Sequence, residues 1–152
     1  METETRWLNA EQQVAWRAYL LGTARLMAKL DEDLRRFGIG INDYEILVRL
    51  SEAPDRRLRM ADLADRLHQS RSRLTHTVGR LEAGDLVRRT SCTSDKRGVW
   101  AELTEAGFGL LEQAAPYHVD GVRENLVDLA TQEDFAAVGR VFDSVSEHIG
   151  QR

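Results

Sequence analysis

Hydrophobic residues near the N-terminus recur every three or four positions, which is the spacing of one helical face. The pattern predicts a long helix over residues 9–37 that ends at Gly38. A second helix is predicted over about 43–53, with Asn42 as its N-cap and Glu45 completing a capping box. Both helices are amphipathic, so each is expected to bury one face.

The C-terminal third of the chain shows the same helical spacing. Thr104 is a suitable cap for a helix over about 105–129, which Pro116 is expected to kink or divide. Thr131 caps a last helix with an apolar stripe from Phe135 to Ile149. Amphipathic helices are therefore predicted at both ends of the chain.

The middle of the chain has shorter patterns. Two short helices meet at a tight corner and are followed by two strand-like runs that flank a polar, basic, turn-rich tip. The predicted elements are a strand over 57–59, helices over 61–68 and 71–83, and strands over 86–91 and 99–103 around a tip at 92–98. This order predicts a mainly α-helical protein that contains a winged helix-turn-helix with a small β-hairpin wing.

The distribution of charge indicates a function for this arrangement. The whole chain carries a net charge of −4. Residues 56–98 nevertheless contain eleven Lys and Arg and five Asp and Glu, so this segment carries +6 and the remainder −10. A basic segment between acidic flanks is typical of a surface that binds phosphates. On charge alone, a solvated charged surface is an equally good explanation.

The predicted helix over 71–83 has two different faces. Leu74, Val78 and Leu81 fall within a narrow arc and are expected to pack on the core. The outer face is small and polar near the N-terminus, so no bulky apolar residue hinders its entry into a major groove. The alternative is an ordinary solvated face. The residues predicted to read bases are Ser72, Arg73, Thr75 and His76.

The hairpin tip carries two of the basic residues. Arg97 is predicted to enter a minor groove, beside Lys96. Asp95 is predicted to hold Arg97 or a neighbouring arginine through a charge-assisted hydrogen bond. The predicted DNA-binding set is completed by Arg71 and by four backbone contacts, Ser70, Arg80, Arg88 and Arg89.

Several stretches of the chain resemble the multiple-antibiotic-resistance-regulator (MarR) family. The most specific are Asp-x-Arg-Gly at 95–98 and Leu-Thr-x-x-Gly at 103–107. The resemblance implies a bacterial, homodimeric and usually repressive regulator that binds palindromic DNA and often releases it when a small phenolic ligand binds. One departure is Met60, in a stretch where the family often has a Ser or Thr helix cap, which is expected to weaken the start of that helix. The other matching stretches are 63–64, 70–76 and 81–89.

A palindromic site requires a protein with two-fold symmetry. The terminal helices are the predicted dimerisation surface, with Leu8, Val14 and Trp16 near one end of the chain and the 135–149 stripe near the other. An intrachain core is the alternative. The predicted domains are an N-terminal dimerisation helix (1–40), the winged helix-turn-helix (41–104) and the C-terminal dimerisation helices (105–152).

The resemblance also implies a pocket for a small aromatic or phenolic ligand, where the first, second and fifth helices meet the DNA-binding lobe. The candidate ligand-binding residues are Trp16, Tyr19, Arg49 and Tyr117, and core or surface packing is the alternative for each. His118 is a candidate polar or pH-sensitive pocket residue. Cys92 is expected to be unreactive.

Other classes of protein find little support. No run of about 18 apolar residues is present, and the acidic N-terminus lacks a secretory signal, so a cytoplasmic protein without a membrane span is expected. The residues show no nucleophile elbow, no phosphate-binding Gly loop and no metal-ligand spacing, so neither an enzyme nor a cofactor is expected. A winged helix that binds a partner protein and no DNA remains the alternative function.

Overall fold

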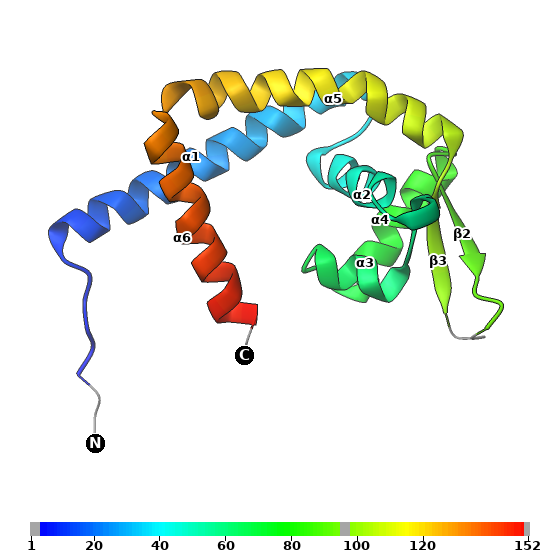
Figure 1. Ribbon diagram of the computed structural model, residues 1–152, viewed down its shortest axis with the longest axis horizontal. Helices are drawn as coiled ribbons and strands as arrows, with labels where there is room; N and C mark the ends of the chain where they lie inside the picture. The colour runs from blue at the N-terminus through cyan, green and yellow to red at the C-terminus, as the bar shows by residue number, and fades with distance from the viewer. Residues whose placement is uncertain (1–3, 95–97, 151–152) are drawn as a thin grey trace. The chain divides into compact units, whose positions relative to one another are not determined.

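The computed structural model describes residues 4–94 and 98–150 (Figure 1). Its elements confirm the predicted fold class, a mainly helical chain with a β wing. The helices are α1 (Ala10–Leu34), α2 (Ile41–Ser51), α3 (Met60–Arg66), α4 (Arg71–Ala83), α5 (Glu105–Asn125) and α6 (Gln132–Gly150), with short 3-10 helices η1 (Arg35–Phe37), η2 (Pro54–Arg56) and η3 (Val127–Leu129). The strands are β1 (Arg57–Arg59), β2 (Val87–Ser91) and β3 (Val99–Leu103).

Packing divides the chain into two compact units. The first unit combines the residues up to Leu30 with those from Val122 onward, so it contains most of α1 and all of α6. The second unit, Asp31–Gly121, contains α2, α3, α4 and the three-stranded sheet. The helix-turn-helix and its wing therefore share one compact unit.

The second unit has a continuous apolar core. Its largest fully buried side chains come from α1, α2, α3, α4 and β2. The strands pair antiparallel in the order β1-β3-β2, and Ala101 of β3 lies between Leu58 of β1 and Arg89 of β2. The fully buried residues are Leu34, Ile46, Leu47, Leu50, Leu63, Leu74, Val78 and Val87.

The start of α2 differs from the prediction. The helix begins at Ile41 and its N-cap is Gly40, so Asn42 lies inside the first turn and the predicted Asn42–Glu45 capping box is wrong. Two carboxylates explain the shift. Asp43 accepts a hydrogen bond from the Gly40 N–H at 2.9 Å, and an Asp31 oxygen accepts one from the Ile41 N–H at 2.9 Å. These bonds satisfy amides that otherwise lack partners at a helix start.

Two other predicted helices each consist of an α-helix followed by a short 3-10 helix. The first predicted helix is α1 followed by η1, and it stops as expected at Gly38, whose φ of 73° favours glycine. Pro116 does not divide α5, which continues to Asn125 and is followed by η3. The proline removes one hydrogen bond and crowds the preceding turn, but that turn is held by the buried residues Leu111 and Ala114.

The first unit leaves apolar side chains exposed. No residue of α6 is buried, and Val141 and Ile149 are 57% and 65% exposed. On α1, Val14 is 68% exposed. Thr131 caps α6 as predicted, because its hydroxyl oxygen accepts a hydrogen bond from the Asp134 N–H at 3.1 Å. Across the described parts of the chain, no helix has the length and apolarity needed to cross a membrane.

Candidate DNA interface

The helix α4 is fixed at its start by a side-chain cap. The Ser70 hydroxyl oxygen accepts a hydrogen bond from the Arg73 N–H at 3.2 Å, as the sequence predicts for an N-cap. The predicted inner face is confirmed, since Leu74, Val78 and Leu81 are all buried. Thr77 is buried beside them, and its hydroxyl donates to the Arg73 carbonyl at 3.1 Å.

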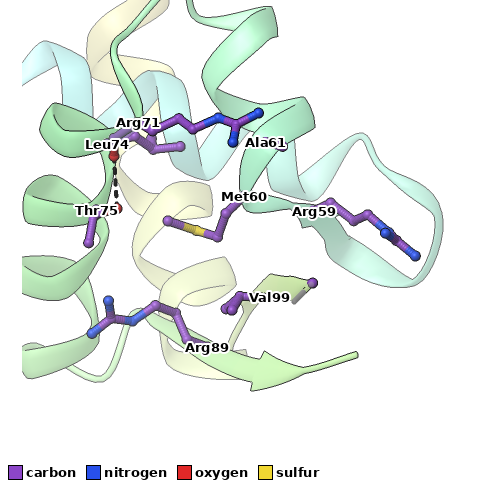
Figure 2. A pocket seen from close by; sticks show the side chains of 9 residues that line it. Arg59, Met60, Ala61, Arg71, Leu74, Thr75, Arg89 and Val99 are labelled. Atoms are coloured by element: carbon purple, nitrogen blue, oxygen red, sulfur yellow. Dashed lines mark hydrogen bonds between the residues drawn. The ribbon is translucent and has the colours of Figure 1, made fainter. Parts of the chain in front are cut away.

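The four predicted base readers all face solvent on the N-terminal half of α4. Ser72, Arg73, Thr75 and His76 are exposed, on the side away from the core. The Thr75 hydroxyl donates a hydrogen bond to the Arg71 carbonyl at 2.8 Å, which Figure 2 shows as a dashed line. The oxygen lone pairs and the methyl group of Thr75 remain available to a ligand.

A tight corner connects α3 to α4. The helix α3 ends at Arg66, earlier than predicted, and His68 has a left-handed φ of 50° that turns the chain. The Gln69 N–H then donates to the Ala64 carbonyl at 3.0 Å. At the other end of α3, no side chain caps the helix at Met60, as the departure from the family pattern predicts.

Three of the predicted backbone contacts form ion pairs within the protein. Arg88 pairs with Glu102 at 3.0 Å, on the neighbouring strand. Arg89 pairs with Glu82 of α4 at 2.9 Å, and Arg80 pairs with Asp43 of α2. None of these partners is a close sequence neighbour, so sequence reasoning did not identify them.

Glu82 holds the first residues of the wing against α4. Its carboxylate accepts hydrogen bonds from the Arg89 backbone N–H at 2.7 Å and from the Arg89 guanidinium at 2.9 Å. These two bonds, the backbone bond first, lower the pKa of Glu82. Glu82 is therefore ionised at neutral pH and connects α4 to β2.

A hollow of about 350 Å³ lies beside the first turns of α4. Arginines from three elements line it together with Met60: Arg59 of β1, Arg71 of α4 and Arg89 of β2, and Figure 2 shows the Arg59 guanidinium directed away from Met60. Sequence reasoning did not place Arg59 in the site. The available signal was the alternation around Leu58 in β1, which predicts that the two flanking arginines point away from the core.

The wing is closed by a backbone hydrogen bond from the Cys92 N–H to the Gly98 carbonyl at 2.8 Å. The Cys92 thiol is buried and lies 3.5 Å from a guanidinium nitrogen of Arg59. The predicted tip residues Asp95, Lys96 and Arg97 lie outside the described residues.

The Leu-Thr-x-x-Gly stretch has a clear structural role. The Thr104 hydroxyl donates to the Asp85 carbonyl at 2.6 Å and accepts from the Gly107 N–H at 2.9 Å, so it caps α5, as predicted, and ties it to the turn before β2. A Cβ atom on Gly107 would lie only 2.1 Å from the Leu86 carbonyl oxygen. Only glycine allows the helix and the turn to approach this closely.

The predicted ligand-binding residues have different surroundings. In the first unit, Trp16 stacks on Tyr19 with ring centroids 5.5 Å apart, and Tyr19 contacts Phe142 at 5.4 Å. In the second unit, Arg49 lies 4.0 Å from Glu45, on the same helix.

Two further pocket candidates lie on α5 in the second unit. The ring centroids of Tyr117 and Phe37 are 5.4 Å apart, and the Arg36 guanidinium carbon lies 4.6 Å from the Tyr117 ring centroid. The His118 ring packs at a tilt against the Tyr44 ring, with centroids 4.4 Å apart, and burial lowers the pKa of His118. Within residues 4–94 and 98–150, no group of three or more His, Cys, Asp and Glu is placed to hold a metal ion.

Comparison with known proteins identifies the family to which the second unit is similar. The MarR family model matches residues 37–98. The HTH-type transcriptional repressor YetL of Bacillus subtilis is 31% identical, over 72% of this chain and 67% of YetL. The regulator AbsC of Streptomyces coelicolor is 44% identical with a TM-score of 0.93, over 97% of this chain and 100% of AbsC.

A second Streptomyces coelicolor regulator, Sco3205, was crystallised in complex with DNA. It is 44% identical with a TM-score of 0.92, over 95% of this chain and 91% of that protein. These matches favour DNA binding over a winged helix that binds only proteins. The chain therefore belongs to the MarR family and is a DNA-binding transcriptional regulator, not an enzyme.

Proposed function

We propose that the protein is a homodimeric repressor that binds a palindromic operator and releases it when a small molecule binds. The observation that carries the proposal is the exposed N-terminal half of α4. Its polar side chains face solvent while the opposite face is anchored in the core. Major-groove reading requires a helix whose inner face is packed on the core and whose outer face is polar and exposed.

Each base reader has a specific part in the proposal. Arg73 carries a forked guanidinium suited to the O6 and N7 acceptors of guanine. Thr75 presents its methyl group to thymine, because its hydroxyl proton is already given to the Arg71 carbonyl. Ser72 and His76 supply shorter polar contacts to neighbouring base edges.

Phosphate contacts hold the helix in register. The Ser70 hydroxyl accepts from the Arg73 N–H and still has its proton to donate to a phosphate. Arg71 and Arg89 line the hollow beside α4, where a phosphate oxygen would meet several donors. Arg88, Arg80 and Lys96 complete the backbone set, and Arg97, held by Asp95, probes the minor groove.

The exposed apolar faces of α1 and α6 support the homodimer. Large apolar patches on a soluble chain mark an interaction surface, and Val14, Val141 and Ile149 are each more than half exposed. A second copy burying the same faces would give the two-fold symmetry that a palindrome needs.

For ligand release we propose a small aromatic or phenolic molecule. The candidate contacts are Trp16 and Tyr19 in the first unit and Arg49 and Tyr117 in the second, which offer aromatic surfaces and a cation to such a molecule. The expected location of the protein is the cytoplasm, where it meets the chromosome. YetL is a repressor, which supports repression over activation.

Fluorescence anisotropy with the DNA upstream of the gene tests the proposal. Binding should select an inverted repeat over a scrambled sequence and should weaken steeply with salt, because phosphate contacts release counterions. A ligand of the proposed class should lower the affinity. Equal affinity for both sequences would contradict the proposed function.

A further inference from the structure

Asp43 is a buried carboxylate at the start of α2 that also contacts α4. The residue is 6% exposed. One oxygen accepts a hydrogen bond from the Gly40 N–H at 2.9 Å, and the other accepts one from the Arg80 guanidinium. A single side chain thus caps α2 and binds the last-turn arginine of the recognition helix.

The two partners of this pair are buried to different extents. The Asp43 side chain is 8% exposed, whereas the Arg80 side chain is 58% exposed. A buried carboxylate that loses its cation is strongly destabilised, while an exposed arginine loses little on leaving. The ionised Asp43 carboxylate is therefore stabilised by Arg80. Movement of Arg80 toward another anion would leave this buried charge unpaired and is unfavourable.

The other paired arginines are held by more accessible acids. The Glu82 and Glu102 side chains are 36% and 29% exposed, so water can replace their arginines. Arg88 and Arg89 can exchange a carboxylate for a DNA phosphate at low cost. Arg80 is the arginine of these three for which that exchange is most unfavourable.

We propose that Asp43 is a specificity-determining residue that keeps Arg80 away from DNA phosphates. With its charge neutralised, the C-terminal half of α4 adds little to sequence-independent binding. Discrimination then depends on the exposed side chains of the N-terminal half. This inference rests on the proposed function, and it removes Arg80 from the set of backbone contacts.

The substitution Asp43→Asn tests the proposal on non-operator DNA. The amide oxygen of Asn can still accept from the Gly40 N–H, so the α2 cap is kept while the charge that holds Arg80 is lost. We expect tighter binding to scrambled DNA and a slope of log K against log salt that steepens by about 0.9, the value for one more phosphate contact. The operator preference should fall.

Asp31→Asn is the matched control. Asp31 supports the same helix start by accepting from the Ile41 N–H, but it pairs with Arg35 and not with Arg80. It changes the net charge by the same amount, so it should leave the salt slope unchanged. The double variant Asp43→Asn/Arg80→Gln should lose the steeper slope of Asp43→Asn.

Thermal melting establishes that each variant is folded. If Asp43→Asn does not fold, the double variant Asp43→Asn/Arg80→Gln, which leaves no buried charge unpaired, decides: the wild-type slope should be retained, and a slope shallower by about 0.9 would overturn the proposal. An unchanged slope in folded Asp43→Asn would also overturn it. Wild-type protein that binds operator and scrambled DNA equally would instead refute the proposed function, which separates the two failures.

Discussion

The two compact units of this protein bury their apolar residues to different extents. In the second unit, Leu63 and Val78 are fully buried in a core shared by helices and sheet, whereas α6 of the first unit has no buried residue and exposes Val141 and Ile149. The elements of the winged helix-turn-helix therefore lie in a unit with its own apolar core. The first unit leaves apolar side chains of α1 and α6 exposed, which supports the proposal that it forms the dimer surface.

The largest expected effect tests the self-sufficient core of the second unit. In Gly107→Ala, the new methyl group would meet the Leu86 carbonyl oxygen, so α5 would be forced away from the turn before β2. We expect a loss of about 3 kcal/mol or more in the free energy of unfolding, measured by denaturant titration. Gly109→Ala is the control, because its Cβ would meet nothing within 4 Å. It should stabilise the helix slightly, and similar losses in both variants would contradict the explanation.

The next prediction concerns the exposed faces of the first unit. Val141→Asp places a charge on the proposed dimer surface but should leave the fold of the single chain intact, because Val141 is 57% exposed. Sedimentation equilibrium should show a monomer, with operator affinity reduced about 100-fold through lost bivalency. Glu147→Gln serves as a surface control on the same helix. A Val141→Asp protein that remains dimeric would disprove this assignment.

A smaller effect should distinguish residues of the second unit that read bases from residues that contact phosphates. Arg73→Ala should cost about 1–3 kcal/mol of operator binding and reduce the preference over scrambled DNA, as measured by anisotropy. Ser72→Ala should have a weaker effect of the same kind. An equal loss of affinity on every sequence would mean that Arg73 contacts only phosphates.

The smallest expected effect is a pH dependence of the second unit. Burial lowers the pKa of His118 below its ordinary value of 6.5, so the folded state binds fewer protons than the unfolded state in that range. Stability should therefore fall slightly as pH decreases below 6.5, because the ring is only partly buried. Melting temperatures of wild type and His118→Gln between neutral and mildly acidic pH check this. A His118→Gln protein with the same pH dependence as wild type would exclude His118 as the source.

Local patterns were enough to predict most of the second unit. The caps at Ser70 and Thr104 and the buried face of α4 follow from residues close in sequence, and the structure bears them out. The cap of α2 differs from the prediction because Asp43 accepts from Gly40, three residues away, a local pairing that the choice of Asn42 excluded, and because Asp31 accepts from Ile41, ten residues away. Such a contact depends on how α1 and α2 meet, which no local pattern encodes.

The electrostatics of the candidate site needed the structure for the same reason. Arg80 and Asp43 are 37 residues apart in sequence, and their pairing is visible only once α2 and α4 are packed. Sequence reasoning identified Arg80 as a predicted contact to the DNA backbone. It did not identify the carboxylate of Asp43 that already neutralises its charge. It also missed Arg59, which reaches the hollow beside α4 only because β1 joins the sheet.

Guanine methylation interference on the operator tests the central claim most directly, because N7 of guanine lies in the major groove. If the N-terminal half of α4 reads that groove, methylation of guanines within each half-site should block binding of the wild-type protein, and Arg73→Ala should become insensitive to at least one of those guanines. Wild-type binding that is indifferent to methylation at every guanine of the operator would contradict the account.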